Sequence, residues 1–562
     1  MIKIKDLTFT YPGAENPQLQ GINLEIKKGD FVAIVGNNGC GKSTLCKTLN
    51  GLIPHFFVGD FAGDVWLNDM NTKDYSIGEL AREIGYVYQD FENQIVRPSV
   101  LDEASFACLN YAMPDYLERG RRAIQLAGLY EQENDYIWQL SGGQKHLLAL
   151  AGAIALSPGI IVLDEPIAQL DPMHAVLIYD LLKQLNELQK ITIIVIEHHT
   201  EFIADYCQKV IMMKEGRIEW QLPVKEALNR MDDLEAVNVF PPQITQATAL
   251  AQQSGKINIQ TQLPVTLSEG VKLFKKRTFK IVEKRQYQRL QADCVIDLSE
   301  VYQDYRAVKG DNKVVLDGLD LKVYRGEKVA LIGSNGAGKS TILKLMTGLL
   351  KPKKGRVSLC DCDTREYDVE QLSKFISLVY QNPEQMFIKD NIREDIAFSM
   401  KMRGVPNCEQ RTDELLQMFR LGSLQDKDGR LLSGGQMRRA SLAVGIALEP
   451  TILLLDEPTA NLDIATRREI THTLEDMKNI METVVISTHD MQLVAEWADR
   501  IIVLCEGEVI ADGSRDEIFS NERVGNIAGI RPPAIFTAAK MIDPSAICYS
   551  VSEFVECLEK EA

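Results

Sequence analysis

Two glycine-rich segments of the chain have the residue types and spacing of a loop that binds phosphate. One reads GNNGCGKST from Gly36 to Thr44, and the other reads GSNGAGKST from Gly333 to Thr341. Glycines allow backbone N–H groups to turn toward a phosphate, the lysine reaches the terminal phosphates, and the hydroxyl after it binds Mg²⁺. We therefore expect both segments to line a nucleotide site. The residues so assigned are Gly36, Asn37, Asn38, Gly39, Cys40, Gly41, Lys42, Ser43, Thr44, Gly333, Ser334, Asn335, Gly336, Ala337, Gly338, Lys339, Ser340 and Thr341, with Ser43 and Ser340 on Mg²⁺.

The first of these loops has a thiol, Cys40, where the second has Ala337. A thiol beside a lysine and a helix start can be acidified and redox-sensitive. The alternative is that the position requires only a small side chain.

Acidic pairs follow two apolar segments, IIVLDEP and ILLLDEP. Asp164 and Asp456 end strand-like runs, where a carboxylate without a charged partner would be unfavourable. Mg²⁺ supplies that partner, and the adjacent Glu165 and Glu457 are placed to polarise an attacking water. The alternative is an acid that caps the N-terminus of a helix.

The segment LSGGQ occurs in both halves of the chain and is called here the signature segment. Its serine is expected to cap a helix, and its two glycines leave backbone N–H groups free for an anion. Each half already has a phosphate loop, so the simplest interpretation is that each signature segment serves the nucleotide of the other half. The residues assigned are Ser141, Gly142, Gly143, Gln144, Ser433, Gly434, Gly435 and Gln436.

These motifs recur in one order, so the chain is an internal repeat. The phosphate loops are offset by 297 residues, and the Gln-containing, signature and acidic segments by 292. We expect a first module over 1–252, a basic linker over 253–290 and a second module over 291–562. Apolar strand-like runs such as 31–36 and 160–164 alternate with helix-like segments, which predicts a largely parallel sheet covered on both faces.

The predicted linker contains eight Lys or Arg residues between Val271 and Arg289, in a chain whose net charge is −17. Such a run is typical of a solvated linker. It also fits contact with anionic lipid head groups or an acidic partner.

The bulk composition favours a protein that acts in the reducing cytoplasm. The N-terminal residues lack the apolar region of a signal peptide, and the apolar runs are shorter than a membrane-spanning helix requires. The 11 cysteines are scattered, as in reduced cytosolic proteins. The acidic net charge argues against a mainly nucleic-acid-binding surface, and we expect no nucleic-acid partner.

Taken together, the motifs resemble those of ATP-binding-cassette (ABC) nucleotide-binding domains over nearly the whole chain. The resemblance implies an α/β fold of two P-loop NTPase domains in tandem, each with a mainly parallel sheet, a helical subdomain and a short C-terminal extension. It implies ATP and Mg²⁺ as ligands, ATPase activity, and pairing of the two halves. It also implies roles for Gln89 and Gln381 on Mg²⁺ and in catalysis, for Asp171 and Asp463 in the loop after the acidic pair, for His198 and His489 as γ-phosphate switch residues, and for Tyr11 and Tyr302 as adenine-stacking residues.

Two of these assignments have a neighbouring competitor. His199 directly follows His198, and the alignment of the next apolar run favours His198. Tyr305 lies close to Tyr302, which stands opposite Tyr11 in an ungapped alignment.

The segments VYQDFENQIV and VYQNPEQMF resemble the extended glutamine loop of the ATPases that power energy-coupling-factor (ECF) transporters, and the Pro-containing tail after each module resembles their C-terminal extension. The resemblance implies two membrane partners, a transmembrane scaffold subunit and a substrate-binding subunit. It also implies uptake of a vitamin or metal ion, and a peripheral location on the cytoplasmic face of the cell membrane.

Two other functions fit a tandem protein of this kind. One is a translation factor that acts on ribosomes, which the basic linker suggests and the acidic charge opposes. The other is a fused ATPase for sugar import, in which one site is often degenerate, whereas both sets of catalytic residues are present here.

Overall fold

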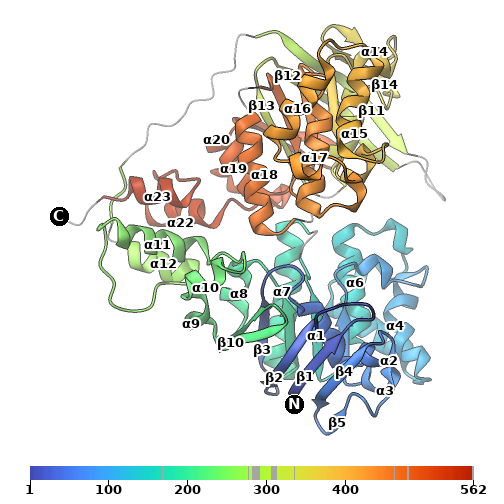
Figure 1. The fold of residues 1–562 in the computed structure, drawn as a ribbon, viewed down its shortest axis with the longest axis vertical. Coiled ribbons are helices and arrows are strands. Elements are labelled where there is room, and N and C mark those ends of the chain that lie inside the picture. The colour runs from blue at the N-terminus through green and yellow to red at the C-terminus, as the bar shows by residue number, and fades with distance from the viewer. Residues whose placement is uncertain are drawn as a thin grey trace. The chain divides into compact units, whose positions relative to one another are not determined.

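The computed structural model describes residues 1–167, 170–275, 277–280, 292–305, 313–334, 336–460, 462–477 and 480–559. These form two compact units (Figure 1). The first unit contains Met1–Lys280 and the end of the chain from Ala538, and the second contains the described residues up to Thr537.

The first unit is built on two sheets. The antiparallel sheet has the order β2-β1-β4-β5, and the mainly parallel sheet has the order β10-β9-β3-β8-β7-β6. Their strands are β1 Ile2–Thr10, β2 Leu19–Ile26, β3 Phe31–Val35, β4 Asp60–Leu67, β5 Met70–Asn71, β6 Ile84–Val87, β7 Ile160–Asp164, β8 Thr192–Ile196, β9 Lys209–Lys214 and β10 Arg217–Pro223.

Helices cover the parallel sheet, and α4, α5 and α6 pack together as a helical part (Figure 1). The helices are α1 Lys42–Leu49, α2 Leu52–His55, α3 Ile77–Leu80, α4 Val100–Asn110, α5 Tyr116–Leu126, α6 Gly142–Ile154, α7 Pro172–Gln189, α8 Thr200–Tyr206, α9 Val224–Leu228, α10 Met231–Glu235, α11 Gln243–Gln253 and α12 Leu267–Phe274, with 3₁₀ turns η1 Phe91–Asn93, η2 Tyr130–Gln132 and η3 Ile137–Gln139.

The second unit repeats this plan. Its sheets have the orders β12-β11-β14-β15 and β16-β17-β18-β13-β19-β20. The strands are β11 Cys294–Tyr305, β12 Lys313–Tyr324, β13 Lys328–Gly333, β14 Lys354–Leu359, β15 Cys362–Asp363, β16 Ile376–Val379, β17 Ile452–Asp456, β18 Thr483–Ser487, β19 Arg500–Cys505 and β20 Glu508–Ser514. The helices are α13 Lys339–Met346, α14 Val369–Leu372, α15 Ile392–Met402, α16 Cys408–Met418, α17 Gly434–Ile446, α18 Ile464–Asp476, α19 Met491–Trp497, α20 Arg515–Phe519 and α21 Glu522–Ala528, with 3₁₀ turns η4 Pro383–Met386, η5 Gly422–Leu424 and η6 Gly429–Leu431. Helix α22 Ala534–Ile542 begins in the second unit and ends in the first, and α23 Val551–Cys557 lies in the first.

The parallel strands are buried on both faces, which explains their continuous apolar sequences. In β3, Phe31, Ala33 and Val35 belong to one hydrophobic cluster, whereas Val32 and Ile34 belong to the cluster on the opposite face. The strand pairs in parallel with β8 and β9. This core holds the carboxyl ends of β3 and β7 in fixed positions, and the loops that carry the chemistry begin there.

The compact units do not coincide with the two sequence repeats. Residues 538–559 pack in the first unit, where the Phe554 ring lies 5.3 Å from that of Phe274 and 5.0 Å from that of Phe279. The Lys256 ammonium donates to the carbonyl oxygens of Val555 and Leu558 at 2.5 and 2.7 Å. Residues of the predicted linker, among them Lys256, Phe274 and Phe279, therefore pack against these C-terminal residues. Its basic residues Lys276, Lys284, Arg285 and Arg289 lie outside the described residues.

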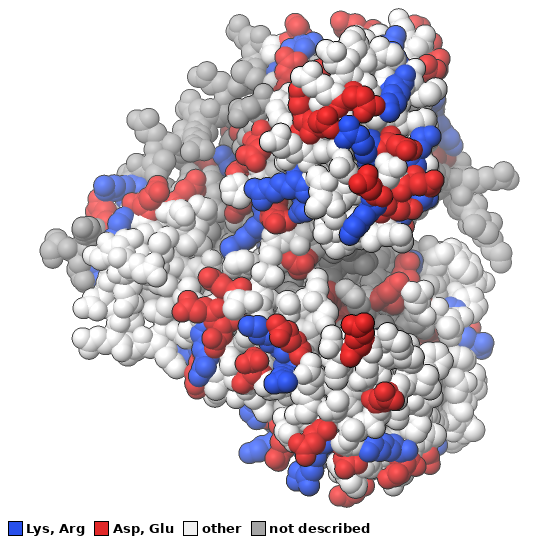
Figure 2. All heavy atoms as spheres, viewed as in Figure 1, with Lys and Arg blue, Asp and Glu red and all other residues white. Residues whose placement is uncertain are grey.

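Acidic and basic side chains are interspersed on the face of each unit that Figure 2 shows. The surface around α11, whose sequence has no charged residue, is mostly uncharged (Figure 2). Within the described ranges, no helix combines the length and hydropathy needed to cross a bilayer.

Two candidate nucleotide sites

Each phosphate loop connects a buried strand to a helix that begins at the predicted lysine. Gly41 and Gly338 precede the helices with φ of 105° and 100°. A Cβ on Gly41 would lie 2.8 Å from the Gln18 carbonyl oxygen, and one on Gly338 would lie 2.8 Å from the Leu316 side chain. Only glycine fits such a turn, which points the first N–H groups of α1 and α13 into the loop.

The two loop lysines are buried and lie across their own loops. Lys42 Nζ donates to the carbonyl oxygens of Gly36 and Asn37 at 2.7 and 3.0 Å, and Lys339 Nζ donates to that of Gly333 at 2.7 Å. The ammonium groups therefore lie beside the loop N–H groups, where a phosphate oxygen can bind to both. All predicted residues of both loops are described except Asn335.

Burial decides between the two interpretations of Cys40. Its side chain is 3% exposed. Burial raises the pKa of the thiol, and the nearby Lys42 charge offsets this only in part. The geometry therefore supports a small residue that fills the loop rather than an acidified thiol.

The predicted Mg²⁺ ligands converge in both units. Ser43 lies beside Asp164, and Ser340 lies beside Asp456, close enough for each hydroxyl to lower the pKa of the neighbouring carboxyl group. Burial raises the pKa of both carboxyl groups, so each is poorly solvated as an anion. A hydroxyl and a carboxylate are hard oxygen donors of the kind that Mg²⁺ prefers, and its charge would compensate the burial.

Gln89 and Gln381 lie in the loop after β6 and β16, called here the Q-loop. In the first unit, the Gln89 amide donates to Glu165 Oε2 at 2.8 Å, beside Asp164. In the second unit, Gln381 lines a cavity of about 910 Å³ together with Ser340 and Asp456. The donor sets therefore fit the predicted metal sites.

The catalytic candidates Glu165 and Glu457 have backbone φ angles of 49° and 46°. Few residues other than glycine adopt this left-handed conformation, and it is often retained at functional sites. Each backbone is held by an N–H bond to the neighbouring strand, to Ile196 at 3.1 Å and to Ser487 at 2.8 Å. The conformation is thus built into the end of β7 and of β17.

Histidine rings contact both glutamates. His198 Nε2 lies 3.3 Å from Glu165 Oε1, and His489 Nδ1 lies 2.9 Å from Glu457 Oε2. Burial opposes ionisation of both carboxyl groups, but the histidines and the loop lysines outweigh it and lower the pKa of each. Both glutamates are therefore held as carboxylates, the form that can accept a proton from water.

The structure separates His198 from His199. His199 is the N-cap residue of α8, and the equivalent N-cap of α19 is Asp490. The residues before them, His198 and His489, are the ones that face the glutamates. The predicted pair is therefore the pair that the geometry brings into equivalent positions.

The tyrosine assignment needs a correction in the second unit. Tyr11 and Tyr305 each place their hydroxyl 3.3 Å from the threonine that ends the phosphate loop. Tyr302 instead lies within β11, opposite Lys354, with the Lys354 ammonium over its ring. Strands β1 and β11 align at an offset of 294 residues, since Ile4 and Leu298 occupy equivalent places in the two sheets. Tyr305 is therefore the counterpart of Tyr11.

Each signature segment starts a helix, as predicted. Ser141 and Gln144 form a reciprocal capping box at the start of α6, and Ser433 and Gln436 form one at the start of α17. In each unit the N-terminus of the following helix, α7 or α18, lies against the signature glycines. A Cβ on Gly143 would lie 2.6 Å from His174, and one on Gly435 would lie 2.4 Å from Thr466.

Asp171 and Asp463, which precede these helices, are N-cap residues. Asp171 accepts from the backbone of α7 and lies 2.7 Å from His174 Nδ1, and Asp463 accepts from Thr466. Sequence reasoning missed His174 and Thr466, whose only signal is their shared position three residues after the aspartate.

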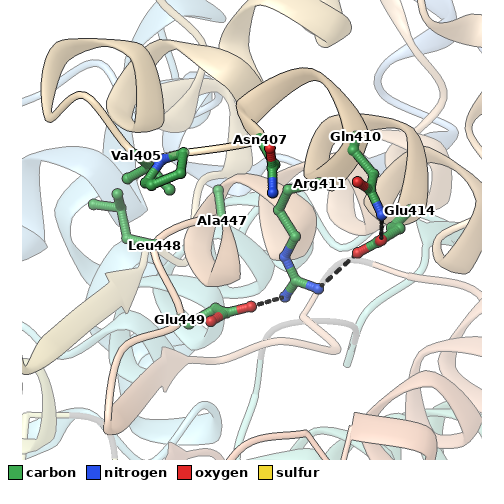
Figure 3. A pocket seen from close by; sticks show the side chains of 9 residues that line it. Val405, Asn407, Gln410, Arg411, Glu414, Ala447, Leu448 and Glu449 are labelled. Carbon is green, nitrogen blue, oxygen red and sulfur yellow. Dashed lines mark hydrogen bonds and ion pairs between the residues drawn. The ribbon is translucent and has the colours of Figure 1, made fainter.

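A smaller cavity of about 250 Å³ lies in the helical part of the second unit (Figure 3). Arg411 projects into it and pairs with Glu414 and Glu449 at 3.4 and 3.2 Å (Figure 3). Two carboxylates already surround this guanidinium, so we assign no ligand to the cavity.

Comparison with known proteins places this geometry in a family. The family model described as ABC transporter matches residues 19–168 and 316–460. The chain belongs to the ABC transporter family. It is an ATP-binding subunit with two ATPase cassettes, which bind ATP with Mg²⁺ and hydrolyse it.

Relatives match this ABC protein over its full length. It is 32% identical to an ABC transporter ATP-binding protein, TTE1589, of Caldanaerobacter subterraneus subsp. tengcongensis, over 100% of this chain and 99% of the relative. It is 31% identical to an ABC transporter ATP-binding protein of Methanosarcina acetivorans, over 100% of this chain and 92% of the relative. The solved structure of cbiO1 from Clostridium perfringens, part of the ABC transporter complex cbiONQ, matches 42% of this chain and 94% of its own at 31% identity, with a TM-score of 0.38.

Proposed function

We propose that this ABC subunit powers an ECF-type transporter that takes up a micronutrient, a vitamin or a metal ion, through separate membrane subunits. It would lie on the cytoplasmic face of the cell membrane, with its two cassettes paired around two ATP molecules. The observation that carries the proposal is that each unit holds a complete catalytic set. In each, a glutamate with left-handed backbone contacts a histidine next to a serine–aspartate pair.

The residues of each cassette have separate tasks in ATP hydrolysis. Mg²⁺, held by the serine, the aspartate and the Q-loop glutamine, would neutralise charge on the phosphates. Glu165 and Glu457 accept a proton from the attacking water. His198 and His489 orient these carboxylates and contact the γ-phosphate. Tyr11 and Tyr305 stack on adenine.

Pairing of the two cassettes would complete both sites. Each signature segment presents the start of an α-helix with free N–H groups, which suits an anion. The phosphate loop of the same unit already has its own helix start, so the partner for the signature is the ATP on the other cassette. ATP would then favour the closed pair, and hydrolysis would release it.

The ECF assignment is supported by the Q-loops and the tails. VYQNPEQMF in the second cassette fits the extended Q-loop pattern of ECF ATPases more closely than VYQDFENQIV in the first. The Pro-containing tails form helices, α11 in the first unit and α22 after Pro532 and Pro533. A motion of the Q-loops on ATP binding would be passed to the membrane scaffold subunit.

Purification from native membranes tests the proposal. We expect a small polytopic scaffold subunit and a substrate-binding membrane subunit to co-purify with the chain in mild detergent. A Lys42→Ala/Lys339→Ala variant should retain these partners but lose ATP-driven uptake in vesicles. Sedimentation of the chain with ribosomes and not with membranes would contradict the proposal.

A further inference from the structure

The second residue after each signature glutamine differs between the cassettes. His146 occupies this place on α6, and Arg438 occupies it on α17. Both side chains are 2% exposed. A buried polar side chain normally has hydrogen-bond partners, so the two positions can be compared by what each side chain contacts.

Arg438 connects the Q-loop to the catalytic strand. Its guanidinium donates to the carbonyl oxygens of Tyr380 at 2.8 Å and Gln381 at 2.7 Å, and to that of Glu457 at 3.4 Å. The planar fork of arginine can hold several acceptors at fixed directions. One side chain thus links two consecutive Q-loop residues to the residue that activates water.

His146 makes no such connection. Neither ring nitrogen has a hydrogen-bond partner among the residues that the structure describes, and the ring stacks on Phe91 with centroids 4.5 Å apart. Burial lowers the pKa of this imidazole to about 4, so it is uncharged at neutral pH. The Phe91–His146 pair is therefore an apolar contact between α6 and the Q-loop.

In the first cassette, other side chains near the surface hold the Q-loop. Gln94 bridges the loop, accepting from the Tyr88 N–H and donating to the Tyr86 carbonyl oxygen, both at 3.2 Å. Lys145 pairs with Glu92 at 2.6 Å, with the Glu92 side chain 61% exposed. An exposed pair of this kind holds a loop weakly, because water and salt compete with it.

We propose that Arg438 is a positioning residue that fixes the Q-loop of the second cassette to its catalytic glutamate, and that His146 leaves the first Q-loop less constrained. The two ATP sites then respond unequally to the same membrane subunit. In the second cassette the position of the Q-loop reaches the Glu457 backbone through the Arg438 guanidinium, whereas in the first it reaches Glu165 through the side-chain bond from Gln89.

Hydrogen–deuterium exchange of the nucleotide-free full chain measures this without catalysis. In R438H, we expect amides of residues 380–388 to exchange about tenfold faster, because bonds from a charged donor are lost. Residues 88–96 serve as the internal control and should not change. R438K keeps the charge without the fork and should restore part of the protection.

The reverse variant imports the second cassette's arrangement into the first. At the 292-residue offset Pro383 stands opposite Phe91, so the matched variant is F91P/H146R. We expect slower exchange in residues 88–96 and no change in 380–388. Because R438H removes a buried cation and can destabilise its unit, this variant and R438K provide the same test with a cation present at the altered position.

Steady-state kinetics add a second measurement. If Arg438 positions the loop for chemistry, R438H lowers kcat several-fold with KM for ATP within about twofold, since the Arg438 guanidinium bonds to carbonyl oxygens of the Q-loop and of Glu457 and not to the phosphate loop. Unchanged exchange in 380–388 of a folded R438H or R438K protein, with kcat unchanged, would overturn the proposal. So would an F91P/H146R protein that folds but shows no added protection in 88–96.

Discussion

In the first unit the Gln89 amide bonds to Glu165 at 2.8 Å and His198 lies 3.3 Å away, whereas in the second unit His489 lies 2.9 Å from Glu457 and Arg438 holds the Glu457 carbonyl. The lysine, serine, glutamine, aspartate, glutamate and histidine assigned to chemistry are of the same types in both cassettes. The residues around them differ. The groups assigned to ATP and to the attacking water are therefore shared, whereas the side chains that support them differ between the cassettes.

The residue before each switch histidine also differs between the cassettes. Glu197 is buried and accepts N–H bonds from His198 and His199 and a hydroxyl bond from Tyr179. Thr488 takes its place in the second unit and accepts from the Asp490 N–H. The first cassette therefore places a carboxyl group behind its switch histidine, where the second has a hydroxyl.

The largest expected effect concerns the phosphate-loop lysines, which should be equivalent despite these differences. Lys42→Ala and Lys339→Ala each remove a charged donor, so the affinity of the altered site for ATP should fall about 10- to 100-fold. Binding of a fluorescent ATP analogue should drop from two sites to one in either variant. Two sites remaining in one variant would show that its cassette does not use the lysine.

Acid should destabilise the first cassette more than the second through His146. Its pKa lies at about 4 in the folded state, below the ordinary value of 6.5. Below 6.5 the unfolded state binds the proton more readily, so the contribution of this group to stability is complete above pH 6.5 and is lost as the pH falls toward 4. The loss reaches about 2 to 3 kcal/mol near pH 4.5.

Thermal unfolding of wild type and His146→Gln between pH 7 and 4.5 measures this loss. The variant, which cannot titrate, should show a smaller decrease in the midpoint of the transition that belongs to the first unit. Equal decreases in the two proteins would mean that His146 is protonated without penalty.

A smaller effect on ATP binding is expected at the adenine site of the second cassette, where Tyr302 serves as a control for Tyr305. Tyr305→Ala should lose about 1 to 3 kcal/mol of base stacking and weaken ATP binding at that site. Tyr302→Ala should leave it within about twofold, because Tyr302 packs under Lys354 instead. Isothermal titration with ATP separates the two variants, and a larger loss from Tyr302→Ala would reverse the assignment.

The smallest expected effect is on the exposed pair that holds the first Q-loop. Lys145→Met copies the second cassette, which has Met437 at this place. An exposed ion pair contributes about 0 to 1 kcal/mol, so stability at moderate salt should change little. The small difference in stability between wild type and Lys145→Met should disappear in high salt. A large difference that persists in high salt would contradict a weak, solvent-exposed ion pair.

Much of the fold follows from sequence because the relevant patterns are local. Continuous apolar runs before Gly36 and Asp164 predicted buried parallel strands, and the signature serines predicted helix starts. Equivalent positions in the two repeats were harder to assign where one repeat has an insertion. Five extra residues between Gly51 and Val65 change the offset from 297 to 292, and a further shift displaced Tyr302 from the position of Tyr11.

Contacts between distant segments could not be read from local patterns. Nothing in the tail sequence shows that Phe554 packs against Phe274 and Phe279. The bonds from Arg438 to the Q-loop form only because α17 packs close to β16 in the folded unit. The difference itself is visible in the sequence, because a residue-by-residue comparison of the repeats places His146 opposite Arg438.

The central claim is that both cassettes hydrolyse ATP, and the ATPase rates of Glu165→Gln, Glu457→Gln and the double variant test it most directly. Each single variant should lower the rate by about half or more, since each removes at least the share of its own site. The double variant should lose about 100-fold or more, the usual contribution of a general base. A single variant that retains the full wild-type rate would contradict the claim, because its cassette would then bind ATP without hydrolysing it.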